Sequence, residues 1–172
     1  FVLMFLLRGL PFVDLAYLRK SDLRDNVITY RRRKTGRPLS VTLTPEALEL
    51  LKKYMNRDSH SPYLFSLLKS GEGTKEAYRE YQLALRSFNQ QLTLLGEVLG
   101  LNDRLSSYTA RHTWATTAYY CEIHPGIISE AMGHSSIKVT ETYLKPFRNK
   151  KIDEANNQII DFVKHSIAGV VA

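Results

Sequence analysis

The sequence is poor in the features that mark membrane, secreted and metal-binding proteins. Its 172 residues include one cysteine, Cys121, which excludes an internal disulfide or a multi-cysteine metal site and suits a reducing cytoplasm. No apolar run reaches the roughly 18 residues that a membrane-spanning helix needs. The opening FVLMFLL lacks the charged start and cleavage site of a signal peptide, and no initiator methionine precedes it. We therefore expect the chain to begin inside a helix of a larger protein.

Positive charge is the property that the chain has in excess. Its formal net charge is +7, and its pI is about 9.5. A compact domain this basic attracts polyanions, of which nucleic acid is the commonest, although a merely basic surface gives the same total. The stretch YRRRKTGR concentrates five cations in eight residues.

Hydrophobic periodicity predicts a mainly α-helical domain with one small antiparallel β-sheet, an α+β fold. NVITYRRR and PLSVTL alternate and are joined by KTGR, which predicts a β-hairpin with a cationic tip. Thr44 and Pro45 are typical of a helix start, Gly133 of a helix end, and Ser106 or Ser107 could cap the helix that follows them. We expect Pro146 to separate the last two helices. The predicted helices cover about residues 1–9, 11–23, 44–55, 75–99, 108–120, 125–133, 139–144 and 150–168.

The second half of the chain holds the residues that indicate chemistry. Tyr108 and Arg111 are three residues apart in the first turn of a predicted helix, so they share a face. A helix N-terminus attracts anions, and an arginine there can hold two phosphate oxygens at once. His134 follows, and Tyr143 comes nine residues later. Arginine, histidine and tyrosine without an acidic metal-binding cluster indicate phosphoryl transfer without a metal.

At this point the resemblance to a family becomes specific. The stretch TARHTWATTAYYCEIHPGIISEAMGHSSIKVTETYLK resembles the C-terminal half of a tyrosine recombinase (phage integrase family) catalytic domain. RHTWAT fits its arginine–histidine–threonine run, MGH its leucine–glycine–histidine, and TETY its nucleophilic tyrosine. Lys34 in RRRKTGR fits the lysine of the family's β-hairpin turn, and RGLPFVDLAYLRKSDL resembles the first arginine-bearing motif. The resemblance spans about residues 1–148.

The resemblance implies a role for each matching residue. Tyr143 would attack the scissile DNA phosphate and become a 3′-phosphotyrosine, while Arg111 holds the non-bridging oxygens and His134 donates a hydrogen bond to one of them. Lys34 would protonate the departing 5′-oxygen. A free tyrosine has a pKa near 10 and needs such cationic surroundings at neutral pH. No metal, ATP or other cofactor is implied.

Two positions depart from the family pattern. Tyr108 stands where the family usually has histidine; a phenol is a poorer proton shuttle at pH 7, so we expect it to support catalysis and leave the general base open. Pro11 occupies the column of the first arginine, while Asp14 fits that motif's acidic position. We expect Arg8, three residues upstream, to supply the missing guanidinium; the alternative is that Arg8 only pairs with Asp14 or caps a helix.

The remaining expectations concern surfaces and partners. We expect His112 to brace its helix from within the fold. Four hairpin arginines are predicted to bind DNA: Arg31, Arg32, Arg33 and Arg37. The resemblance implies one catalytic domain over residues 1–172, with the family's N-terminal DNA-binding domain absent from it. It also implies a cytoplasmic, mobile-element enzyme that acts on double-stranded DNA. We expect it to form a homotetramer on DNA and a monomer in isolation.

Two expectations leave alternatives open. The helix over 150–168 either docks on a neighbouring protomer or folds back on its own core. The function is either site-specific recombination, DNA binding by a module that has lost catalysis, or supercoil relaxation by a type IB topoisomerase, which shares the chemistry.

Overall fold

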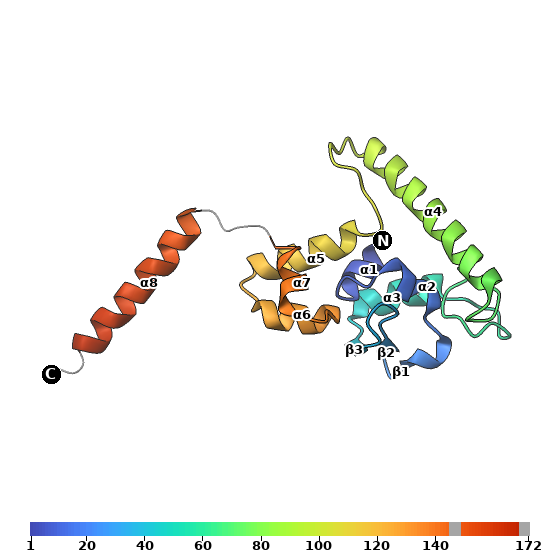
Figure 1. The fold of residues 1–172 in the computed structure, drawn as a ribbon, viewed down its shortest axis with the longest axis horizontal. Coiled ribbons are helices and arrows are strands. Elements are labelled where there is room, and N and C mark those ends of the chain that lie inside the picture. Colours follow the sequence, from blue (N-terminus) through green and yellow to red (C-terminus); the bar gives the residue numbers. More distant parts are fainter. Residues whose placement is uncertain (145–148, 169–172) are drawn as a thin grey trace.

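The structure, a computed structural model, describes residues 1–144 and 149–168 and is mostly helical (Figure 1). Its one described sheet has three antiparallel strands in the order β1-β2-β3, which confirms the predicted fold class. The elements are α1 (Val2–Leu6), α2 (Phe12–Tyr17), a 3₁₀ turn (Lys20–Asp22), β1 (Leu23–Arg24), β2 (Val27–Arg31), β3 (Pro38–Thr42), α3 (Pro45–Tyr54), α4 (Lys75–Val98), α5 (Thr109–Tyr120), α6 (Pro125–Met132), α7 (Ile137–Glu141) and α8 (Asn149–Ala168).

The predicted hairpin is formed by β2 and β3, which pair from Val27 opposite Thr42 to Arg31 opposite Pro38. Gly36 has φ +68° in the turn, a conformation that residues with a Cβ rarely adopt. The sequence did not predict β1, because two residues are too few to show an alternating pattern.

Local signals place most helix ends. The Thr44 side chain accepts a hydrogen bond from Ala47 N and Pro45 begins α3, as expected. Gly133 ends α6 in the left-handed conformation. Other bounds differ from the prediction: α1 ends at Leu6 rather than near residue 9, and α2 ends at Tyr17 rather than near residue 23. Helix α5 has Tyr108 at its N-cap, without a side-chain cap, and α7 runs over 137–141 rather than 139–144. Pro146 lies outside the described residues.

Two hydrophobic clusters form the interior. The larger one joins α1, α2, the sheet, α3 and the segment 63–68, and residues of α4 pack against it. The smaller one contains Ala115, Ile128 and Met132, from α5 and α6, with Tyr143 packed against them. Ala110 of α5 belongs to the larger cluster, so α5 spans both. Arg111 therefore lies where the two clusters meet.

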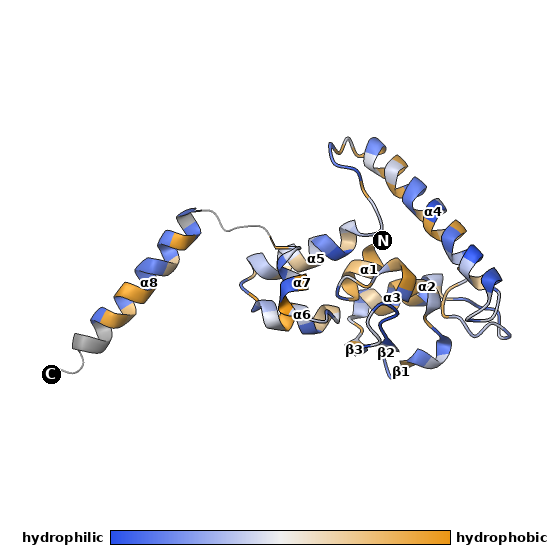
Figure 2. Ribbon diagram, viewed as in Figure 1, coloured by the Kyte–Doolittle hydropathy of each residue, from blue (hydrophilic) through white to orange (hydrophobic). Residues whose placement is uncertain are grey.

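Helix α8 extends away from the rest of the described protein (Figure 1). Figure 2 shows apolar residues along it, and five of them are exposed: Ile152, Ile159, Ile160, Phe162 and Val163. An ion pair between Lys151 and Glu122 joins its first turn to the end of α5. Docking on a neighbouring protomer and folding back on the core both stay predictions. Among the described residues, no helix is both long and apolar enough to cross a membrane.

Candidate active site

Arg111 is the centre of the candidate site and is almost fully buried, with 2% of its surface exposed. Its Nη1 donates to the Gly9 carbonyl at 2.8 Å, and its Nη2 donates to the Met132 carbonyl at 2.8 Å. Gly9 permits this approach, since a Cβ there would lie 3.0 Å from Arg111 Cα. The guanidinium thus ties the end of α1 to the end of α6.

His134 is held in one tautomer by its two neighbours. Its Nε2 lies 2.7 Å from Arg111 Nη2, and its Nδ1 lies 2.8 Å from Thr140 Oγ1. A guanidinium can only donate, so Nε2 accepts and the ring proton resides on Nδ1, which donates to Thr140. Thr140 is fully buried on α7. The sequence analysis missed it, because nothing in a single polar residue of a short helix signals this contact.

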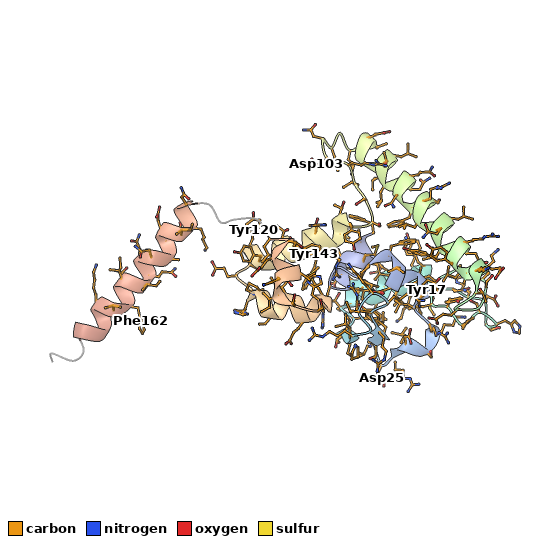
Figure 3. The ribbon with its side chains drawn as sticks, in the orientation of Figure 1. Tyr17, Asp25, Asp103, Tyr120, Tyr143 and Phe162 are labelled. Atoms are coloured by element: carbon orange, nitrogen blue, oxygen red, sulfur yellow. The ribbon has the colours of Figure 1, made fainter. Side chains whose placement is uncertain are left out.

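Tyr143, which is labelled in Figure 3, follows α7 and is half-buried. Its ring centroid lies 5.2 Å from that of His134, with the rings nearly parallel. The Arg111 Cζ lies 5.9 Å from the same centroid. Thr116 Oγ1 donates to the Tyr143 carbonyl at 3.1 Å, which fixes the backbone here. The structure therefore brings together the arginine of α5, the histidine between α6 and α7, and the tyrosine that follows α7.

The cationic hairpin turn is bound to the junction between α6 and α7. It donates hydrogen bonds to three consecutive carbonyl groups: Arg32 Nη1 to Met132 at 3.0 Å, Thr35 Oγ1 to Gly133 at 3.3 Å and Arg37 Nη1 to His134 at 2.7 Å. Lys34 is exposed in this anchored turn, and its charge contributes to a lowered His134 pKa. The docked turn thus brings the predicted lysine close to the site.

Arg8 is not placed where the sequence analysis expected it. It has φ +58°, and its Nη1 donates to the Ser40 carbonyl at 3.2 Å. It lines a surface hollow of about 390 Å³ with residues of β3 and α6. Asp14 pairs instead with Arg32, whose Nε lies 3.0 Å from Asp14 Oδ2. The physical reason is that the left-handed turn at Arg8 directs its side chain to β3 rather than to Arg111.

The four hairpin arginines do not form one solvated face. Arg32 is 5% exposed and therefore does not lie at the surface, while its predicted contact with DNA stays a prediction. Arg33 lies over the Tyr17 ring at 3.7 Å and pairs with Glu72 at 2.5 Å. Arg31 is exposed, and its Nη1 bonds to the Gly36 carbonyl at 3.1 Å. Arg31 and Arg33 are the members that remain at the surface.

Tyr108 and His112 occupy the outer side of α5. Tyr108 is 50% exposed, and its ring lies 6.0 Å from that of His112. His112 is exposed rather than enclosed in the fold, and its ring centroid lies 4.4 Å from that of Tyr143. The expectation that it braces the helix from within is therefore wrong. Its place immediately after Arg111 in the RHTWAT motif was the signal that could have identified His112 as a residue of the site.

The electrostatics of the site favour neutral histidines in the absence of DNA. Burial, followed by the charges of Arg111, Arg32 and Lys34, lowers the pKa of His134 to about 4. Burial also lowers the pKa of His112, and Arg111 adds to that effect. Burial lowers the Arg111 pKa too, with the neighbouring Arg32 charge acting in the same direction. In the described part of the chain, no three histidine, cysteine or acidic side chains lie close enough to hold a metal ion.

The lowered His134 pKa predicts acid-sensitive stability. An unfolded histidine titrates near pH 6.5, whereas folded His134 titrates at about 4. As the pH falls between these values, the unfolded chain takes up a proton that the folded chain refuses. The free energy of unfolding should fall by about 1.4 kcal/mol per pH unit for this one group, and not at all above pH 7. Urea denaturation from pH 4 to 8 measures this dependence of the free energy of unfolding on pH.

The control for that experiment is His134→Gln, whose amide can still accept from Arg111 and donate to Thr140. His112 titrates in both proteins, so its effect cancels in the difference. The variant's stability should be flatter between pH 4 and 6.5. Parallel curves for the two proteins would contradict the assignment.

Comparison with known proteins identifies the class to which this fold and site belong. The structure aligns with the crystal structure of XerA recombinase, with a TM-score of 0.62, 21% identity and coverage of 91% of this chain and 54% of that one. It also aligns with the Tn1549 transposon integrase in complex with transposon right end DNA, with a TM-score of 0.64, 17% identity and coverage of 92% and 58%. The fold is that of tyrosine recombinase catalytic domains.

The sequence then gives the family. The model of the phage integrase family matches residues 1–150, and the chain belongs to that family. Tyrosine recombinase XerC of Haemophilus ducreyi is 29% identical over 134 residues, which are 75% of this chain and 42% of the relative. The chain thus spans less than half the length of the curated relatives that it matches.

Proposed function

We propose that this chain is the catalytic domain of a site-specific DNA recombinase that cleaves and rejoins double-stranded DNA through a 3′-phosphotyrosyl intermediate. One observation carries the proposal: the Tyr143 ring lies beside both Arg111 and His134, within a single protomer. A nucleophile beside a buried cation and an imidazole fits attack on a phosphodiester. The family membership and the DNA-bound transposon integrase of the same fold support DNA as the substrate.

The proposed reaction exchanges one phosphodiester for another. The Tyr143 oxygen attacks phosphorus as its proton passes to a general base, and the bond from phosphorus to the 5′-oxygen breaks. Lys34, in the docked turn, gives a proton to that 5′-oxygen, which departs as a hydroxyl. The phosphotyrosyl bond conserves the energy of the cleaved diester, so a 5′-hydroxyl can reverse the reaction without ATP.

The buried groups must rearrange when a phosphate arrives. In the DNA-free structure Arg111 Nη2 donates to His134 Nε2, so both groups are engaged with each other. A phosphate oxygen would take this donor from Arg111, and His134 would then need a proton on Nε2 to donate in turn. The negative phosphate makes that proton easier to hold, since a nearby opposite charge raises a histidine pKa. Tyr108, exposed at the edge of the site, has a supporting role.

A nicked DNA substrate tests the proposal, because loss of the short cleaved fragment prevents religation and traps the covalent protein–DNA adduct. The target site is first captured from cleaved genomic DNA and sequenced. Adduct formed in the presence of a metal chelator supports the recombinase. No adduct from the full-length protein would leave a DNA-binding module, and relaxation of supercoils without recombinant product would favour a topoisomerase.

We further propose that α8 assembles protomers, with four on a recombining pair of DNA sites and one when the protein is alone. The support is its exposed apolar residues, among them Ile159 and Phe162, which is 74% exposed. We also propose that a separate N-terminal DNA-binding domain contributes further contacts to DNA. The setting we propose is a mobile element acting in the cytoplasm, where the exposed thiol of Cys121 stays reduced.

Changing the apolar surface of α8 should separate assembly from chemistry. We expect Ile159→Ser with Phe162→Ser to abolish the four-protomer complex on two DNA sites while a single site still yields adduct. Light scattering gives the mass of the complex, and the nicked substrate gives the adduct. Lys164→Ala, which removes a charged residue from the same helix, is the matched control. Normal assembly of the double variant would show that α8 has another role.

A further inference from the structure

Arg32 is buried, whereas a residue that contacts DNA at the surface would be exposed. It follows β2 and is nearly fully buried, although it lies in the most cationic stretch of the chain. Its Nη1 and the Nη2 of Arg111 donate to one and the same oxygen, the Met132 carbonyl, at 3.0 and 2.8 Å. Two guanidinium groups from distant parts of the chain therefore converge on one neutral acceptor.

This arrangement leaves positive charge without a counterion. Of the acidic side chains in the described residues, only Asp14 forms an ion pair with Arg32 or Arg111. That pair lies at 3.0 Å but lacks hydrogen-bond geometry, so Asp14 Oδ2 and Arg32 Nε are both buried without a hydrogen bond. Burial raises the pKa of Asp14, which makes its charged form less favourable. Two buried cations with one carboxylate between them favour a further anion.

Asp14 brings Arg32 close to the motif in which Pro11 replaces the family's first arginine. Pro11 stands where the family usually has arginine, at the N-cap of α2, and Asp14 lies one helical turn later. Arg32 reaches that turn from the hairpin, and Gly133 allows it to do so: a Cβ there would lie 2.9 Å from Arg32 Cγ. Arg8 is bonded to Ser40 at the edge of β3 instead.

We propose that Arg32 is the second guanidinium of the phosphate clamp, supplied by the hairpin in place of the residue that Pro11 replaces. In this assignment the Met132 carbonyl occupies the place of a phosphate oxygen until DNA binds. Arg32 and Arg111 then hold the two non-bridging oxygens of the scissile phosphate as negative charge grows on them. The inference rests on the proposed recombinase function and adds a catalytic residue to it.

A change in the DNA tests the role of charge directly. The nicked substrate is made with an ordinary phosphodiester and, separately, with a methylphosphonate, in which a methyl group replaces one non-bridging oxygen and removes the negative charge. On the phosphodiester, Arg32→Ala should slow adduct formation by about 10²–10³-fold, the usual loss when one donor to a developing oxyanion is removed. On the neutral linkage the deficit should shrink to less than about tenfold, because there is no charge left to offset.

Controls separate this role from folding. Arg24→Ala removes an exposed cation from β1 of the same sheet and should cleave both substrates at the wild-type rate. Arg32→Lys keeps a cation for Asp14 but lacks the planar fork, so it should fold and still cleave the phosphodiester at least about tenfold more slowly. If Arg32→Ala does not fold, the same comparison is made with Arg32→Lys: its loss of rate relative to the wild type is measured on the phosphodiester and on the methylphosphonate.

The outcomes are distinct. A selective deficit on the charged linkage supports Arg32 as a clamp. Wild-type rates in both Arg32 variants, or an equal deficit on both linkages, would overturn the inference while leaving the recombinase intact. An absence of adduct from the wild-type protein would overturn the proposed function itself, and the inference with it.

Discussion

Replacing Tyr143 by phenylalanine should abolish the covalent protein–DNA adduct completely while DNA binding persists. The substitution removes only the hydroxyl that would attack phosphorus. The ring stays, and with it the contacts to His112 and His134 and the packing on Ala115 and Met132. We therefore expect the free energy of unfolding to change by no more than about 1 kcal/mol, the net value of a typical hydrogen bond. Gel separation of the adduct after denaturation measures the loss.

A second tyrosine provides the matched control for this experiment. Tyr120, at the end of α5, is 52% exposed. Tyr120→Phe should give the wild-type amount of adduct, and mass spectrometry of the wild-type adduct should place the DNA on Tyr143. Adduct from Tyr143→Phe, or DNA mapped to another residue, would remove the nucleophile from the proposal.

Local signals made most of the fold readable in the sequence. Helix α3 could be predicted because Thr44 and Pro45 mark its start, and α6 because Gly133 adopts the positive φ that ends it. The hairpin could be predicted from alternation and a glycine turn. These signals depend on neighbouring residues. The start of α5 was predicted less well, since its N-cap is Tyr108, which has no side-chain cap.

The candidate site shows where such reasoning fails. Motif spacing selected Arg111, His134 and Tyr143, which the structure brings together. It could not tell which hairpin arginine turns inward, because Arg31, Arg32 and Arg33 look alike in a run of cations. That choice depends on contacts about 100 residues apart, such as Arg32 with the Met132 carbonyl. Arg8 was chosen by its distance along the chain, whereas the left-handed turn there directs it elsewhere.

Removal of the Arg111 side chain is the other change for which we expect a very large effect. Arg111→Ala deletes donors aimed at the place where charge would develop, and one such donor is typically worth about 10²–10³ in rate. DNA affinity should change little, because one phosphate contact among many contributes modestly to binding. Adduct formation at saturating DNA measures the first quantity, and a salt titration of binding measures the second. Arg104→Ala, on the exposed loop before α5, should alter neither.

The structural contribution of Arg111 has to be separated from its catalytic one. The guanidinium also donates to the buried Gly9 carbonyl and shares the Met132 carbonyl with Arg32. Arg111→Ala would leave the Gly9 carbonyl without this donor, and an unpaired buried acceptor costs about 1–3 kcal/mol. Arg111→Lys retains a cation that can reach one of these carbonyls, so it should be more stable than Arg111→Ala. A lysine cannot place two parallel donors on a phosphate, so its cleavage should remain severely impaired despite the recovered stability. If cleavage instead recovered in step with stability, or if binding and cleavage fell together in the salt titration, Arg111 would be a structural tie between α1 and α6 rather than a clamp on the scissile phosphate.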